Sequence, residues 1–102
     1  LIGSGLLLFR KTSSKARLYS LSIAPTERGK GLADRLLKAL EAEATTRACT
    51  SITLEVREGN APAIHVYERV GYSVKERLPG YYPDGETALK MEKALPLKDP
   101  IE

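Results

Sequence analysis

The sequence predicts an α/β fold, in which one mixed β-sheet is flanked by helices. Residues 16–24 and 50–57 alternate apolar and polar side chains with the two-residue period of a strand. A leucine-rich segment between them repeats with the helical period of 3.6 residues. Glycine and proline residues separate these segments and favour turns. The 102 residues are enough for one core, so we expect residues 1–102 to form a single domain.

The first half of the chain is predicted to form two strands and a helix. Residues 6–9 are an apolar run that indicates a buried strand, and the polar residues 10–14 indicate a hairpin turn. The second strand covers residues 16–24 and stops at Pro25, which has no backbone N–H to donate. After a loop, a helix extends to about Ala44. Its apolar face carries Leu32, Leu36, Leu37, Leu40 and Ala44.

The second half adds three strands and a second helix. In the strand at 50–57, Ile52, Leu54 and Val56 point to one side, while the alternate residues Thr53, Glu55 and Arg57 point to the other. Asn60 is a suitable N-cap for the next helix, and Gly71 is suited to end it. Residues 72–78 and 87–93 read as strands on either side of a turn-rich loop. The expected order is strand, strand, helix, strand, helix, strand, strand.

Composition narrows the classes of function. The formal net charge is +3, with basic and acidic residues interspersed, so we expect no nucleic-acid partner and only a small bias toward anionic ligands. The single Cys49 is expected in the core, and His65 on the surface with no metal site. No apolar run is long enough to span a membrane, so we expect a cytoplasmic protein. Because the chain starts at Leu1 in an apolar run, we expect a fragment, and a homodimer that covers an exposed sheet face is an open alternative.

A glycine-containing loop lies between the second strand and the first helix. Gly29 and Gly31 allow a sharp turn and the close approach of a ligand to the backbone. The helix that follows offers unpaired N–H groups and a partial positive charge, which together suit a phosphate or pyrophosphate. The loop contains no P-loop pattern, and Asp34 stands where a dinucleotide fingerprint would need its third glycine.

Three sequence blocks resemble the GNAT superfamily of N-acetyltransferases. Residues 28–33 fit the pattern Arg/Gln-x-x-Gly-x-Gly/Ala, which is similar to the acyl-coenzyme-A pyrophosphate loop of that superfamily. Residues 54–72 resemble its block Leu-Glu-Val-Arg-x-x-Asn-x-x-Ala-Ile-x-x-Tyr-x-x-x-Gly-Phe/Tyr. Residues 80–88 resemble a Tyr-Tyr-x-Asp-Gly-x-x-Ala segment. The resemblance is closest to the branch that acetylates ribosomal-protein alanine and other protein N-termini.

The resemblance implies a GNAT fold and acetyl-CoA as co-substrate. The family usually has a further strand and one or two helices before the point at which this chain starts. The matching cofactor residues would hold the pyrophosphate in the loop, the pantetheine amides along the backbone of the preceding strand, and the pantetheine arm near the second helix. They are Arg28, Gly29, Lys30, Gly31, Leu32 and Ala33 for the pyrophosphate, then Leu21, Ser22 and Ile23, and finally Asn60 and Tyr67.

The resemblance also assigns two catalytic roles. Glu55 matches the family's general base, which removes a proton from the amine, and Tyr67 matches the general acid, which protonates the leaving thiolate. Each residue has a structural alternative. Glu55 can be an exposed strand glutamate paired with Arg57 or Lys15, and Tyr67 can be a core aromatic with its hydroxyl bonded elsewhere.

The acceptor is less closely defined by the sequence. Tyr81 and Tyr82 can line its entrance, or they can be loop aromatics that cover the end of the sheet. The resemblance favours the α-amino group of a protein or peptide, acetylated by direct transfer. A lysine side chain or a small-molecule amine is the second choice. A coenzyme-A-binding module without activity is the alternative outside enzymes.

Overall fold

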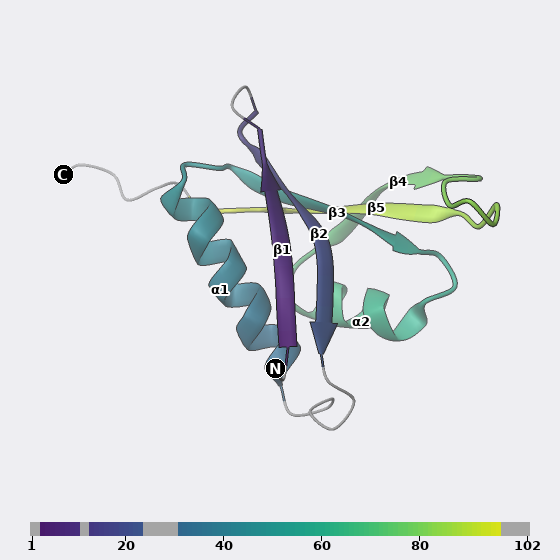
Figure 1. The fold of residues 1–102 in the computed structure, drawn as a ribbon, viewed down its shortest axis with the longest axis horizontal. Helices are drawn as coiled ribbons and strands as arrows, with labels where there is room; N and C mark the ends of the chain where they lie inside the picture. Colours follow the sequence, from purple (N-terminus) through teal and green to yellow (C-terminus); the bar gives the residue numbers. More distant parts are fainter. Residues whose placement is uncertain (1–2, 11–12, 24–30, 97–102) are drawn as a thin grey trace.

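The computed structural model describes residues 3–10, 13–23 and 31–96, and within them every predicted strand and helix is present (Figure 1). The elements follow the expected order, with boundaries within three residues of those predicted. They are β1 (Gly3–Phe9), β2 (Lys15–Ile23), α1 (Leu32–Thr46), β3 (Ser51–Arg57), α2 (Ala61–Arg69), β4 (Ser73–Leu78) and β5 (Ala88–Ala94).

The strands form one mixed sheet in the order β1-β2-β3-β5-β4. β1 and β2 form an antiparallel hairpin, whereas β2 and β3 are parallel neighbours. A parallel pair needs a long crossover, and α1 supplies it. β5 lies antiparallel to both β3 and β4, so the last described strand is inserted between two earlier ones. This order puts β3 in the middle of the sheet.

The ends of the helices confirm the sequence signals. Gly31 precedes α1 with a φ of 72°, in the left-handed region that favours glycine. Asn60 caps α2, because its side-chain oxygen accepts a hydrogen bond of 3.2 Å from the N–H of Ala63. Gly71 follows α2 with a φ of 107°. These residues set where the chain enters and leaves each helix.

One hydrophobic cluster holds the fold together. Its largest fully buried side chains are Leu37 from α1, Ile52 and Leu54 from β3, and Met91 from β5. Apolar residues of α2 pack against the same cluster, so both helices cover the same side of the sheet. The buried Cys49 belongs to this cluster, as expected. Neither described helix therefore covers the other face of β3.

Two polar contacts join Glu41 of α1 to Tyr72, which precedes β4, and to Lys93 of β5. The hydroxyl of Tyr72 donates to Glu41 at 3.2 Å, and the ammonium of Lys93 donates to the same carboxylate at 3.0 Å. Burial, and then the charge of Glu41, raise the pKa of Tyr72 far above its ordinary value. The phenol is therefore neutral in the folded protein.

Neither described helix has the length and apolar character needed to cross a membrane.

Candidate active site

An opening between β2 and β3 is the central feature of the site. The two strands pair in parallel only over Lys15–Leu18 and Ser51–Leu54. Beyond that point β2 continues to Ile23 beside β1 alone, and β3 continues to Arg57 beside β5 alone (Figure 1). A register shift in the β1–β2 hairpin leaves Tyr19 without an opposite residue, which is a β-bulge at the start of the opening. The two strands therefore separate after Leu18 and Leu54.

The backbone of residues 21–23 borders this opening. Gly5, Ser4 and Gly3 pair with these residues on the β1 side, and the facing side has no strand within the described part of the chain. Strand edges of this kind offer N–H and C=O groups to an extended ligand. The side chain of Leu21 packs against the hydrophobic cluster, so its contribution to such a ligand would come from the backbone.

Glu55 is the first residue of β3 beyond the parallel ladder. It lies on the face opposite Leu54, and its side chain is only 15% exposed. Its Oε1 accepts a hydrogen bond of 2.9 Å from Nε of Arg17, and Nη2 of Arg17 lies 2.8 Å from the same oxygen. The arginine also donates to the hydroxyl of Tyr81 at 3.1 Å. Glu55 therefore sits in a chain of polar contacts that joins β3, β2 and the loop before β5.

The expected partners of Glu55 were wrong. Lys15 lies 3.4 Å from Glu92, and Arg57 lies 2.8 Å from Asp84 in the loop before β5. Neither cation is therefore available to Glu55. Arg17 meets it instead because it lies opposite Thr53, which stands two residues before Glu55 on the same face of β3. Alternation marks Arg17 as an outward residue between Ala16 and Leu18, but its partner depends on the pairing of two distant strands.

Tyr67 projects from α2 and is half-buried. Its ring packs edge-on against Tyr72, with the centroids 5.8 Å apart. No hydrogen bond from its hydroxyl is found among the described residues, whereas that of Tyr72 is bonded to Glu41. Burial, and then the nearby Tyr82, raise the pKa of Tyr67 above its ordinary value. Its phenol therefore keeps its proton at neutral pH.

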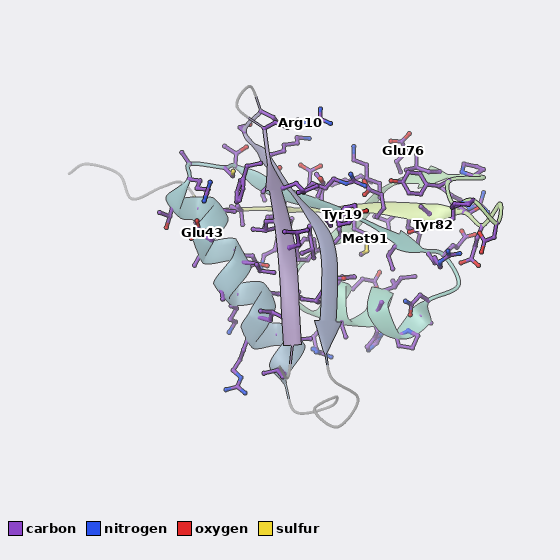
Figure 2. The ribbon with its side chains drawn as sticks, in the orientation of Figure 1. Arg10, Tyr19, Glu43, Glu76, Tyr82 and Met91 are labelled. Carbon is purple, nitrogen blue, oxygen red and sulfur yellow. The ribbon has the colours of Figure 1, made fainter. Side chains whose placement is uncertain are left out.

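The loop before β5 presents two tyrosines to the open face. The rings of Tyr81 and Tyr82 meet edge to face with centroids 5.0 Å apart. The guanidinium of Arg57 lies 4.1 Å from the centre of the Tyr82 ring, which fixes that ring by a cation–π contact. Figure 2 shows Tyr82 at the end of the sheet beside β5. Contacts to Arg17 and Arg57 thus anchor the loop to the strands.

A cavity of about 470 Å³ brings several of these residues together. Its lining joins the candidate base to both loop tyrosines and to the β2 bulge: Arg17, Leu18, Tyr19, Glu55, Tyr81 and Tyr82. Tyr67 and Asn60 are not part of this lining. They lie on α2, on the helical side of the sheet, and Tyr67 is linked to the cavity only by its proximity to Tyr82. The structure therefore brings Glu55 together with Tyr81 and Tyr82.

A second hollow of about 380 Å³ adjoins the first. The two share Arg17, Glu55 and Tyr81. The second extends along the open face toward the β1–β2 hairpin, and its remaining lining residues are Leu8, Arg10, Ser13, Lys15, Thr53 and Lys90. Cations dominate this lining, which the overall charge of the chain did not indicate. The sequence analysis therefore missed the concentration of charge beside the candidate base.

The predicted pyrophosphate loop is described only in part. Arg28, Gly29 and Lys30 lie outside the described residues. Gly31 has the left-handed backbone, and Leu32 and Ala33 open α1. No side chain caps this helix end within the described residues, and a Cβ on Gly31 would meet nothing within 4 Å. Among the described residues, no side chain accepts a hydrogen bond from the first N–H groups of α1. No metal-binding group of three His, Cys, Asp or Glu residues is found in the described regions, and His65 is exposed.

Comparison with known proteins identifies proteins that are similar to this chain in sequence and in fold. Over 79 residues the chain is 44% identical to N-alpha-acetyltransferase 20 of Dictyostelium discoideum. The match covers 76% of this chain and 45% of that protein. The crystal structure of the ribosomal-protein-S18-alanine N-acetyltransferase from Escherichia coli superposes with a TM-score of 0.83 at 28% identity. That match covers 99% of this chain and 66% of the other.

A structure with a different named activity is also similar. Nourseothricin acetyltransferase superposes with a TM-score of 0.88 at 29% identity, covering 93% of this chain and 58% of the other. The chain spans 45% to 60% of the length of the curated relatives that it matches. Residues 1–72 match the family described as acetyltransferase (GNAT). Sequence, fold and strand opening agree, and the chain belongs to the GNAT acetyltransferase family.

Proposed function

We propose that this protein is an acetyl-CoA-dependent N-acetyltransferase that moves an acetyl group directly to a primary amine. The α-amino group of a protein or peptide is the first choice of acceptor. The observation that carries the proposal is Glu55, held at the mouth of the strand opening in a cavity that Tyr81 and Tyr82 also line. One matched relative is named an N-alpha-acetyltransferase and another a ribosomal-protein-S18-alanine N-acetyltransferase, and these names support this acceptor.

The site has features that fit acetyl-CoA. The unpaired edge of residues 21–23 suits the pantetheine amides, which can bond to it as an added strand would. The N-terminus of α1, which no described side chain caps, suits the pyrophosphate, and we assign residues 28–33 to the same ligand. Asn60 stands at the start of α2, where we place the pantetheine arm. Acetyl-CoA would supply the activated acetyl group as a thioester.

The proposed mechanism assigns one proton transfer to each catalytic residue. Glu55 takes a proton from the acceptor ammonium, directly or through water, which leaves a neutral amine to attack the thioester carbonyl. As the carbon–sulfur bond breaks, Tyr67 gives its proton to the sulfur and takes the remaining excess proton from the nitrogen. The products are the amide and the free thiol, and Glu55 releases one proton to solvent. The raised pKa of Tyr67 supports this role, because the phenol holds a proton to donate.

Two further acceptors deserve a test. One is a lysine side chain, whose amine differs from an N-terminus mainly in the reach of its chain. The other is a small-molecule amine, which the likeness to nourseothricin acetyltransferase favours. Outside enzymes, a module that binds coenzyme A without catalysis would use the same loop and strand edge, with Glu55 serving only to hold Arg17.

One experiment separates these outcomes. A peptide with a free N-terminus and one internal lysine is incubated with the protein and acetyl-CoA, and tandem mass spectrometry locates the added acetyl group. We expect it on the α-amine. An acetyl group on lysine would replace the first choice of acceptor by the second. Acetyl-CoA binding without transfer to any amine would favour the non-catalytic module.

The proposal includes a cytoplasmic protein without a nucleic-acid partner, and a homodimer as its alternative state. The interspersed basic and acidic residues of the sequence support the absence of a nucleic-acid partner. Exposed apolar residues on the open face, such as Leu6 and Leu8 of β1, are the reason to consider a dimer. Cell fractionation tests the location, and light scattering tests the oligomeric state.

A further inference from the structure

The loop between β4 and β5 comprises residues 79–87 and contributes two tyrosines to the cavity at Glu55. We infer that Arg57 is a positioning residue, which holds this loop in the conformation required for acetyl transfer. This inference rests on the proposed function and goes one step beyond it. Arg57 would fix one wall of the acceptor site without touching the reacting atoms.

Arg57 lies on the same strand as the candidate base. Glu55 and Arg57 are alternate residues of β3, so their side chains point to the same face of the sheet. Alternate residues of a strand are about 7 Å apart. A contact that holds the loop to Arg57 therefore also sets the distance between the loop and Glu55.

Arg57 makes three contacts with the middle of the loop. Its Nη1 donates to Oδ2 of Asp84 at 2.8 Å, and a carboxylate oxygen of Glu86 lies 3.6 Å from the same nitrogen. Its guanidinium lies 4.1 Å from the centre of the Tyr82 ring. A planar guanidinium can form ion pairs at its edge while its face lies on an aromatic ring. One side chain thus contacts two carboxylates and a ring that lines the cavity.

Asp84 connects this contact to the backbone of the loop. Its Oδ2 accepts from Arg57, and its Oδ1 accepts a hydrogen bond of 3.0 Å from the N–H of Glu86. The carbonyl of Glu86 in turn accepts from the N–H of Tyr82 at 3.1 Å. The bond from Glu86, and then that from Arg57, lower the pKa of Asp84, so its carboxylate is charged at neutral pH.

The two ends of the loop are held by Glu58. The guanidinium of Arg77, near the end of β4, donates to both carboxylate oxygens of Glu58, at 2.7 and 2.9 Å. The N–H of Glu58 donates to the carbonyl of Thr87, the last residue of the loop, at 3.0 Å. Loss of Arg57 should therefore free the middle of the loop while its ends stay attached to the sheet.

The exposure of the ion pair separates its effect on activity from its effect on stability. The side chains of Arg57 and Asp84 are 41% and 58% exposed. Such pairs add little to stability, because solvent screens their charges and their side chains lose entropy. Activity is more sensitive, since a misplacement of about 1 Å can lower a rate by about a hundredfold. Variants of Arg57 should therefore unfold like wild type and acetylate less efficiently.

Steady-state kinetics of Arg57→Gln test the inference. We expect kcat/KM for a peptide acceptor to fall about tenfold, because the remaining bond between Tyr81 and Arg17 limits the displacement. The KM for acetyl-CoA should stay unchanged, since none of the residues assigned to that ligand lies in the loop. Arg57→Lys keeps the charge but not the planar fork, so it should restore only part of the loss. Wild-type kcat/KM in Arg57→Gln, or an equal rise of both KM values, would overturn the inference.

Arg47→Gln is the matched control. Arg47 also forms an ion pair of 2.8 Å, with Glu43, and its guanidinium also lies over a ring, 4.3 Å from the centre of Phe9. Figure 2 shows Glu43 on α1, far from Tyr82 at the other end of the sheet. Kinetics and unfolding midpoint should equal those of wild type. A similar loss of kcat/KM in both arginine variants would contradict a specific role for Arg57.

A fluorescent reporter follows the loop without any need for activity. The sequence contains no tryptophan, so Tyr82→Trp supplies a single reporter, and its ring keeps the cation–π contact. When Arg57→Gln is added, we expect lower anisotropy and stronger quenching by acrylamide. The same reporter combined with Arg47→Gln should be unchanged. Equal anisotropy and quenching with and without Arg57 would overturn the inference.

The outcomes also separate this inference from the proposed function. If the wild-type protein acetylates no amine, the proposed function fails, and the reporter still decides whether Arg57 holds the loop. If wild type and Arg57→Gln acetylate the peptide equally well, the function stands and the inference fails.

Discussion

The two faces of β3 have the same backbone and opposite chemistry. Toward the helices, Ile52 and Leu54 are each 1% exposed and belong to the hydrophobic cluster. On the other face, Glu55 joins Arg17 and Tyr81 around an open cavity. One face therefore removes apolar surface from water, and the other holds charged groups in a partly enclosed space.

This difference shows how one strand serves both stability and chemistry. A charged pair on a half-open surface contributes little to folding, because solvent screens it and its side chains lose entropy. The hydrophobic face contributes most of the stabilisation and also fixes the position of β3 in the sheet. Because Leu54 is packed in the core, the backbone of the adjacent Glu55 is held in place as well. Substitutions on the two faces should therefore separate stability from activity.

The largest expected effect comes from the helical face. Leu54→Ala removes a fully buried side chain from the hydrophobic cluster and leaves a cavity, so the free energy of unfolding should fall by about 2 to 5 kcal/mol. Urea denaturation followed by circular dichroism measures it. A loss below about 1 kcal/mol would mean that the surrounding core closes over the space.

At the next residue, Glu55→Gln should lower activity and leave stability nearly unchanged. The amide keeps the shape and an acceptor for Arg17, so the unfolding midpoint should change little. Without the base, acetyl transfer should fall by about a hundredfold or more. Steady-state kinetics with a peptide acceptor test this, and Glu43→Gln, on the exposed surface of α1, is the control. Wild-type turnover in Glu55→Gln would leave the residue with a structural role only.

Tyr67→Phe should lower turnover by about tenfold or more and leave acetyl-CoA affinity nearly unchanged, because only the donated proton is lost. The raised pKa of Tyr67 adds a pH dependence. The phenol stays protonated beyond its usual value of 10.0, so wild-type activity should show no loss through this group below that pH. Tyr72→Phe is the matched control, since that hydroxyl is already bonded to Glu41. Equal turnover in Tyr67→Phe would remove Tyr67 from the mechanism.

Gly31→Val should weaken acetyl-CoA binding by at least about tenfold, a factor that corresponds to roughly 1.4 kcal/mol. The left-handed backbone, with a φ of 72°, is strained for a branched residue, and a side chain there would also stand at the open helix end. Gly31→Asn is the control, because asparagine tolerates this conformation. Calorimetric affinities equal to wild type in both variants would argue against a ligand at this end of α1.

The smallest effect is expected at the contact between α1 and the far strands. Tyr72→Phe removes the hydrogen bond to Glu41 and should cost about 1 kcal/mol of stability at neutral pH. The pKa of Tyr72 is raised in the folded state, so its contribution is complete below the usual value of 10.0 and is lost as the pH rises above it. Wild type should therefore lose stability in alkali more steeply than the variant. Parallel pH profiles would exclude this linkage.

Much of the molecule was predictable from local pattern. The alternation at 50–57 identified β3 and its two faces, and Asn60 and Gly71 marked the ends of α2 correctly. These signals are local, since strand period, helix period and caps each involve residues a few positions apart. The three family-like blocks also indicated the family to which the chain belongs.

Side-chain partners were not predictable in the same way. Arg17 and Glu55 are 38 positions apart, and their contact depends on the register of β2 against β3. Lys15 forms its ion pair with Glu92 of β5, and Arg57 forms its ion pair with Asp84 of the loop before β5. The roles proposed for Glu55, Tyr67 and the residues around acetyl-CoA remain predictions for the experiments above.

The sequence by itself determined the elements, their order and which face of each is apolar, because these follow from periodicities and turn residues within short segments. Only the tertiary structure decided that both helices cover one side of the sheet, that β2 and β3 separate after Leu18, and that cations gather beside Glu55. The physical reason is distance along the chain. Such features arise where strands and loops far apart in sequence meet, and no local pattern encodes which of several charged side chains will be within reach.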